Sequence, residues 1–280
     1  MKVDLHVHTT ASDGSWAPRQ LVAQAQAAGI ACLAVTDHDT IAHVEIMEDL
    51  AQAAGMAFIK GVEICTTLKG QSFHILGYGI DTANKNLRHL LDYNTRLMEE
   101  TDHDSMVKLI DCGYPIDLRE YEAYRHDPAR GGWKSLSFLI DKGLCKNAGD
   151  FFAHLFTAER GITFPEFPLP SQAIAAIRDA GGIPVLAHPG SAFHGHELEE
   201  TLNVFGREEI AGIECYHPSH EAETIRDAIA WCRRHSKLIT GGSDCHGEFI
   251  PERKLGYPAV TIDQLQLGEI WPAAATTIGR

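Results

Sequence analysis

Short apolar runs alternate with amphipathic stretches along most of this chain, and this alternation limits the fold more than any other feature. Residues 3–7 predict a first strand, and Pro18 predicts the start of a helix that stops at Gly29. Each strand with its helix takes about 25–30 residues, which favours a parallel sheet with crossover helices. We therefore expect an α/β fold, and a barrel rather than an open sheet. Further strands are expected at residues 30–36, 57–64, 71–80, 183–187, 210–216 and 238–240, and further helices at 41–54, 171–180 and 221–235.

The alternation stops between roughly residues 83 and 168. This stretch has leucine and charged residues at helical spacing, interrupted by prolines. We expect a helical insertion, residues 83–168, that packs over the mouth of a barrel built from residues 1–82 and 169–280. The strands at 57–64 and 71–80 are close enough in sequence to pair as a hairpin.

The charge balance excludes one broad class of function. Among 280 residues, 24 lysines and arginines stand against 38 aspartates and glutamates, a net charge of −14. A protein that binds nucleic acid nonspecifically needs a basic face, so we expect no extended nucleic-acid surface. A small phosphorylated substrate stays compatible with this charge, because bound divalent cations supply positive charge locally.

The remaining composition points to the cytoplasm. The N-terminal MKVDLHVHTT has no apolar segment of the signal-peptide kind, and no apolar run reaches about 18 residues, so we expect no membrane span. Seven cysteines form no CxxC pair and are best explained as buried thiols in a reducing compartment. No obligate protein partner is evident.

Histidines and carboxylates gather where the expected strands end. His6 and His8 are two residues apart on the first strand, so both side chains lie on one face of it. Active sites of βα barrels gather at the carboxyl ends of the strands, which gives these side chains a common location. Imidazole nitrogen with carboxylate oxygen suits zinc, manganese or iron, so the pattern predicts a metal site. The other members of the pattern are Asp13, His38, Glu63, His74, His188, Asp244 and His246.

Five motifs together resemble the PHP (polymerase and histidinol phosphatase) family, and within it the TrpH-like branch. They are HxHTxxSDG at 6–14, TDHD at 36–39, GVE at 61–63, AHP at 187–189 and GSDCH at 242–246. The resemblance implies a distorted (β/α)7 barrel that binds two or three divalent ions. It also implies three ligand sets: His6, His8, Glu63 and Asp244; Asp13, His38 and His246; and Glu63, His74 and His188. Asp13 stands where some members have histidine, which favours manganese or iron over zinc.

The resemblance further implies a metal-dependent phosphoesterase in which a metal-bridging hydroxide attacks phosphorus, with Asp244 among the catalytic residues. Two segments are candidates for holding the phosphate. Arg130 and Lys134 flank the segment Gly131-Gly132-Trp133 before an expected helix, and a loop with two solvated cations is the alternative interpretation. His220 is predicted as a phosphate ligand or general acid, and His217 is as compatible with a surface role. His194 and His196 fit a solvent-facing loop.

Several substrates and one other reaction remain open. The favoured substrate is a phosphomonoester or five-membered cyclic phosphate of a sugar or nucleotide. A 3′,5′-nucleoside bisphosphate or the 5′ end of a short RNA is the alternative. A metallo-amidohydrolase shares the HxH pattern but generally uses a bridging lysine, and no lysine ends an expected strand in the right place.

Overall fold

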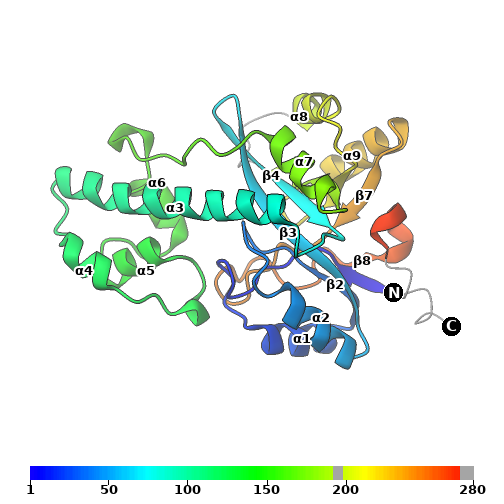
Figure 1. The fold of residues 1–280 in the computed structure, drawn as a ribbon, viewed down its shortest axis with the longest axis horizontal. Coiled ribbons are helices and arrows are strands. Elements are labelled where there is room, and N and C mark those ends of the chain that lie inside the picture. The colour runs from blue at the N-terminus through cyan, green and yellow to red at the C-terminus, as the bar shows by residue number, and fades with distance from the viewer. Residues whose placement is uncertain (192–197, 272–280) are drawn as a thin grey trace.

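The computed structural model describes residues 1–191 and 198–271, and its centre is one mixed sheet (Figure 1). The strands lie side by side in the order β7-β6-β5-β4-β3-β2-β1-β8. The Leu5 amide donates to the Gly241 carbonyl (3.3 Å) and Val7 bridges Cys245, which brings the end of β7 beside the segment after β1. The sheet is thus nearly closed, and the predicted α/β barrel is confirmed. Its strands are β1 Lys2–Asp4, β2 Ile30–Val35, β3 Ala57–Leu68, β4 Gln71–Tyr78, β5 Ile183–Leu186, β6 Gly212–Tyr216, β7 Leu238–Gly241 and β8 Val260–Thr261.

The hairpin expected between residues 57–64 and 71–80 is confirmed, whereas the general expectation of a parallel sheet does not hold at β4 and β8. β4 runs antiparallel to both β3 and β5, and β8 runs antiparallel to β1. Only Lys69 and Gly70 connect β3 to β4, and both have positive φ, as a tight hairpin requires. A parallel crossover needs a dozen or more residues, so this connection cannot make one.

The helices of the barrel pack on the outside of the sheet. Alternation along β2 shows the two layers: Cys32 and Ala34 belong to a core lined by strand residues and the C-terminal segment, whereas Leu33 and Val35 pack with helix residues such as Leu21. These outer helices are α1 Pro18–Ala27, α2 Val44–Ala53, α7 Pro170–Asp179, α8 Leu198–Phe205 and α9 Ala222–Arg234. Two short 3-10 turns, Ile262–Gln264 and Gly268–Ile270, belong to the C-terminal segment that packs on the inner core.

A group of helices between β4 and α7 extends to one side of the sheet (Figure 1). Its longest member, α3, spans Lys85–Asp111 and begins at the capping residue Asn84. The group has an apolar cluster of its own around Met106, Leu136 and Phe151. The first part of α3, with Leu87 and Leu91, packs in a core shared with the barrel, so the division into a barrel and a subdomain at 83–168 stays a prediction. The other members are α4 Leu118–Ala123, η1 Pro128–Arg130, α5 Lys134–Asp141, α6 Ala148–His154 and η2 Ala158–Arg160.

Among the described residues, no helix combines the length and the apolar character that a membrane crossing needs. The predicted loop that holds His194 and His196 lies outside the described residues.

Candidate metal centre

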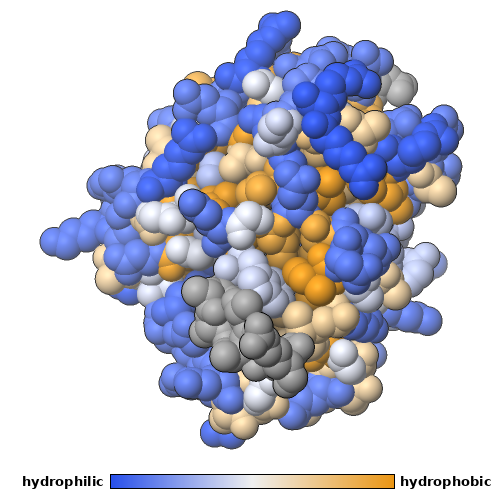
Figure 2. Space-filling view, turned by 90° about the vertical axis from the view of Figure 1, so that its right-hand side faces the viewer, coloured by the Kyte–Doolittle hydropathy of each residue, from blue (hydrophilic) through white to orange (hydrophobic). Residues whose placement is uncertain are grey.

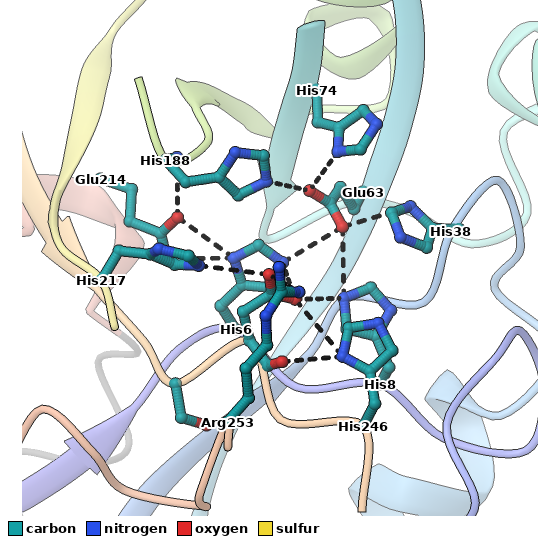
Figure 3. Close-up of polar contacts among 12 residues, drawn as sticks. His6, His8, His38, Glu63, His74, His188, Glu214, His217, His246 and Arg253 are labelled. Carbon is teal, nitrogen blue, oxygen red and sulfur yellow. Dashed lines mark hydrogen bonds and ion pairs between the residues drawn. The ribbon is translucent and has the colours of Figure 1, made fainter. Parts of the chain in front are cut away.

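The carboxylate of Glu63 is the centre of the site, and five imidazoles face it (Figure 3). Oε2 lies 3.1 Å from His6 Nε2, 3.2 Å from His8 Nε2 and 3.2 Å from His38 Nδ1. Oε1 lies 3.0 Å from both His74 Nδ1 and His188 Nε2. Burial by itself would raise the pKa of Glu63, but the surrounding histidines, His6 first, hold the pKa well below its usual range. Glu63 is therefore an anion at neutral pH.

The β3–β4 hairpin explains how His74 joins the site. Cys65 pairs with His74 and Glu63 with Leu76 across the two antiparallel strands. Because β4 runs the opposite way, a residue early in β4 lies at the same end of the barrel as the carboxyl ends of the parallel strands. The interpretation of His74 as one of a series of strand-end residues is wrong in that detail, although His74 reaches the predicted place.

The loop after β7 contributes Asp244 and His246. It approaches β1 so closely that a Cβ on Gly242 would lie 2.5 Å from the backbone nitrogen of His6, so this position needs glycine. Asp244 Oδ1 lies 3.1 Å from His8 Nε2, and Asp13 Oδ2 lies 3.3 Å from His246 Nε2. The structure thus brings the nine predicted ligands together. Their donor atoms, within 4.8 Å of one another in each set, form the groups His6–His8–Glu63–Asp244, His8–Asp13–His38–His246 and Glu63–His74–His188.

Two buried atoms test whether this arrangement fits a cation. His8 Nε2 and Asp244 Oδ1 lie 3.1 Å apart, at ion-pair distance, yet neither atom makes a hydrogen bond of good geometry among the described residues. A buried polar atom without a partner costs about 1–3 kcal/mol. A divalent ion that accepts both lone pairs removes that cost, and imidazole with carboxylate is the donor set of zinc, manganese and iron. The residues fit metal ions.

Glu214 supports two of these histidines and was not predicted. It lies on β6, fully buried, with Oε1 3.0 Å from His6 Nδ1, and its Oε2 accepts the backbone N–H of His188 (2.9 Å). A histidine that donates through Nδ1 presents the lone pair of Nε2 to a metal. The signal in the sequence was a single carboxylate inside the apolar run 210–216.

We expect the Glu214→Gln variant to bind metal about 10–100-fold more weakly, because the carboxylate no longer orients His6 and raises its basicity. Competition with a chromogenic chelator measures this affinity. The exposed Glu223, which pairs with Arg226, provides the matched Glu223→Gln control. An unchanged affinity in Glu214→Gln would contradict the role given to this carboxylate.

The predicted phosphate-binding side chains Arg130 and Lys134 contact their own helical group instead. Arg130 donates to both carboxylate oxygens of Asp141 (2.8 and 2.9 Å), and Lys134 Nζ donates to the Glu122 carbonyl (3.2 Å). The backbone between them reaches the site, since Gly132 N–H donates to the Asp13 carbonyl (2.7 Å). A substrate-binding role for the two side chains stays a prediction.

The two histidines after β6 differ in what they contact. His217 Nε2 lies 3.1 Å from Asp244 Oδ2, so His217 borders the ligand sets. His220 donates through Nδ1 to the Cys215 carbonyl (2.9 Å) and accepts through Nε2 from the Gly190 N–H (3.0 Å). Both ring nitrogens of His220 are thus engaged with the backbone, and its predicted part as general acid would require one of these bonds to break.

Arg253 is a second residue that sequence reasoning missed. Its Nη1 contacts Asp244 Oδ2 from a loop that follows His246 (Figure 3). Glu248 N–H donates to Ser15 Oγ (2.7 Å) and Gly256 N–H to Asp4 Oδ2 (2.7 Å), so both ends of the loop are attached to the barrel. No periodicity or motif in the sequence singled out this arginine.

Comparisons with known proteins define the class of protein to which this chain belongs. The PHP domain model matches residues 4–180. A structure from Bifidobacterium adolescentis, a candidate metal-dependent phosphoesterase, superposes with a TM-score of 0.80 at 28% identity over 95% of this chain and 94% of that one. A structure from Chromobacterium violaceum, described as an amidohydrolase with bound sulfate and no metal, gives a TM-score of 0.77 at 26% identity over 89% and 88%.

Three curated relatives match along most of their length. The phosphoribosyl 1,2-cyclic phosphate 1,2-diphosphodiesterase of Eggerthella lenta is 28% identical over 88% of this chain and 94% of its own. The 5′-3′ exoribonuclease Rnm of Salmonella typhimurium is 33% identical over 87% of this chain and 84% of that protein. The 3′,5′-nucleoside bisphosphate phosphatase of Chromobacterium violaceum is 27% identical over 91% of this chain and 90% of that protein. The chain belongs to the PHP domain family. It is a metal-dependent phosphoesterase.

Proposed function

We propose that this enzyme hydrolyses a small phosphate ester, namely a phosphomonoester or a five-membered cyclic phosphate of a sugar or nucleotide. The observation that carries the proposal is that three neighbouring ligand sets meet in one place: two of them share Glu63, and His8 links the set with Asp244 to the set with Asp13. Similarity to the cyclic phosphate diphosphodiesterase of Eggerthella lenta, along 94% of that protein, supports the substrate class.

Divalent ions bound by these sets would acidify a water molecule and neutralise phosphate oxygens as charge develops on them. The protein residues hold that arrangement in place. One Glu214 carboxylate oxygen orients the His6 ring, and the other accepts the backbone N–H of His188. His217 holds one oxygen of Asp244 and so leaves the other directed at His8. Arg130, Lys134, His217 and His220 remain proposed contacts for the substrate.

Manganese or iron is the proposed native metal, and two or three ions the proposed number. Asp13 adds a carboxylate oxygen to a set otherwise made of imidazoles, which shifts that set toward harder cations. A cytoplasmic location is also proposed, because the described cysteines are free thiols. Among them, Cys215 and Cys232 form a thiol hydrogen bond at 3.7 Å and no disulfide.

The alternative substrate is a 3′,5′-nucleoside bisphosphate or the 5′ end of a short RNA. Similarity to a bisphosphate phosphatase and an exoribonuclease favours it. The amidohydrolase alternative has less support here, since no lysine among the described residues contacts the carboxylates Glu63, Asp244 or Asp13.

Release of inorganic phosphate from three substrates tests the proposal. The protein loaded with manganese receives a ribose 1,2-cyclic phosphate ester together with a phosphomonoesterase, a 3′,5′-nucleoside bisphosphate, and a 5′-phosphorylated trinucleotide. The proposal predicts the highest kcat/KM for the cyclic ester. A higher value for either of the other two would select the alternative, and hydrolysis of none, with the metal sites full, would overturn the assignment of a phosphate ester.

A further inference from the structure

Arg253 lies beside Asp244, one of the predicted metal ligands, and its guanidinium has more hydrogen-bond donors than the one that contacts Asp244. Its Nη1 contacts Asp244 Oδ2, and no other hydrogen bond of its side chain is found among the described residues. A guanidinium carries five N–H donors in a planar fork, a geometry that matches two oxygens of a phosphate. Most of that donor capacity is therefore available.

The position of the side chain is defined by the loop that carries it. The loop is attached to Ser15 at one end and to Asp4 at the other, and Arg253 N–H donates to the Ile250 carbonyl (3.0 Å). The Arg253 side chain keeps 33% of its exposure, whereas Asp244 keeps 3%. The Arg253 side chain thus lies between the buried carboxylate and the solvent.

Electrostatics argue against a role limited to neutralising Asp244. That carboxylate already faces His6 and His8 through Oδ1 and His217 through Oδ2. When divalent ions are bound, a guanidinium beside them is repelled, and the repulsion is strong in a partly buried site. A phosphate group placed between the ions and the arginine converts this repulsion into attraction. Among the described residues, no other arginine or lysine contacts Glu63, Asp244 or Asp13.

We propose that Arg253 binds the non-bridging oxygens of the phosphate that is hydrolysed, while one of its nitrogens stays on Asp244. This inference rests on the proposed function and adds a contact made by the barrel itself, distinct from those proposed for the helical group. It assigns Arg253 to recognition of the phosphate and not of the rest of the substrate. Its loss should therefore weaken binding of every phosphate ester that the enzyme accepts.

Binding of inorganic phosphate to the manganese-loaded protein tests this proposal without turnover. By isothermal titration calorimetry we expect the Kd for phosphate to rise about 100-fold in Arg253→Gln, and by less in Arg253→Lys, which keeps the charge but not the fork. The control is Lys254→Gln, which removes the same charge from the adjacent exposed residue and should leave the Kd unchanged.

Metal content measured on the same samples separates recognition from support of the metal site. An Arg253→Gln protein with wild-type metal content and wild-type phosphate affinity would overturn the proposal. So would a variant that loses metal and regains full phosphate affinity once metal is saturating, because Arg253 would then act only through Asp244. Failure of the wild-type enzyme to hydrolyse any ester would instead remove the proposed function, a result that the calorimetry does not depend on.

Discussion

Replacing Glu63 by glutamine is expected to lower kcat/KM for phosphate ester hydrolysis by about 10³-fold or more. Both oxygens of this carboxylate face histidines, three on Oε2 and two on Oε1. An amide has one acceptor oxygen and no charge, so it cannot hold two cations between those rings. Steady-state measurement of phosphate release under saturating manganese checks the prediction.

The Glu63→Gln result needs a control for folding. Glu63 is buried, so circular dichroism and a melting curve should accompany the kinetics. Glu223→Gln, on the exposed side of α9, should keep full activity and stability. A folded Glu63→Gln protein with more than a tenth of the wild-type activity would contradict the proposal that both oxygens of Glu63 serve as metal ligands.

Removing the metal ions is expected to lower the melting temperature by about 5–10 °C. Ligand binding at a hundredfold excess over Kd stabilises a protein by about 2.7 kcal/mol, and a domain of this size shifts by about 2–4 °C per kcal/mol. Manganese restored after treatment with a chelator should return the wild-type curve. An identical melting curve with and without chelator, in a sample shown to have lost its metal, would refute the metal centre.

The difference in melting temperature between the metal-loaded and the metal-free protein should widen from pH 6 to pH 9. Burial lowers the pKa of His8, but its contacts with Asp244 and Glu63 raise the pKa to about 10 when metal is absent. A proton on His8 thus stabilises the metal-free fold fully below about pH 6.5, the unfolded value, and this stabilisation fades as the pH rises toward 10. Metal must displace that proton, so its affinity increases over the same interval. A difference in melting temperature that stays constant across this pH range would contradict the competition between metal and proton at His8.

Local patterns predicted much of this site because its residues follow the barrel strands in chain order. His6, His38, Glu63 and Asp244 each come at or directly after an apolar run, and the closure of the sheet brings these positions together. The direction of β4 depends on a two-residue connection rather than on the repeating strand–helix pattern, so the hairpin expected from the short connection is present and the parallel pattern does not extend to β4.

Contacts between distant segments were beyond the reach of local patterns. Glu214 orients His6 across 208 positions of the chain, and a lone carboxylate in a buried strand has no periodicity to reveal its partner. Arg253 likewise gives no signal until the loop after β7 is placed beside Asp244. Arg130 has a carboxylate partner in Asp141, eleven residues along the chain, which the motif around Gly131 did not suggest.

Titration of metal-free protein with manganese, with phosphate release measured at each addition, tests the central claim most directly. The claim is that hydrolysis depends on divalent ions, which the three neighbouring ligand sets around Glu63, Asp244 and Asp13 would hold. It predicts no activity without metal and a rate that rises until two or three equivalents per chain are bound. Full activity in protein that contains no metal would contradict it.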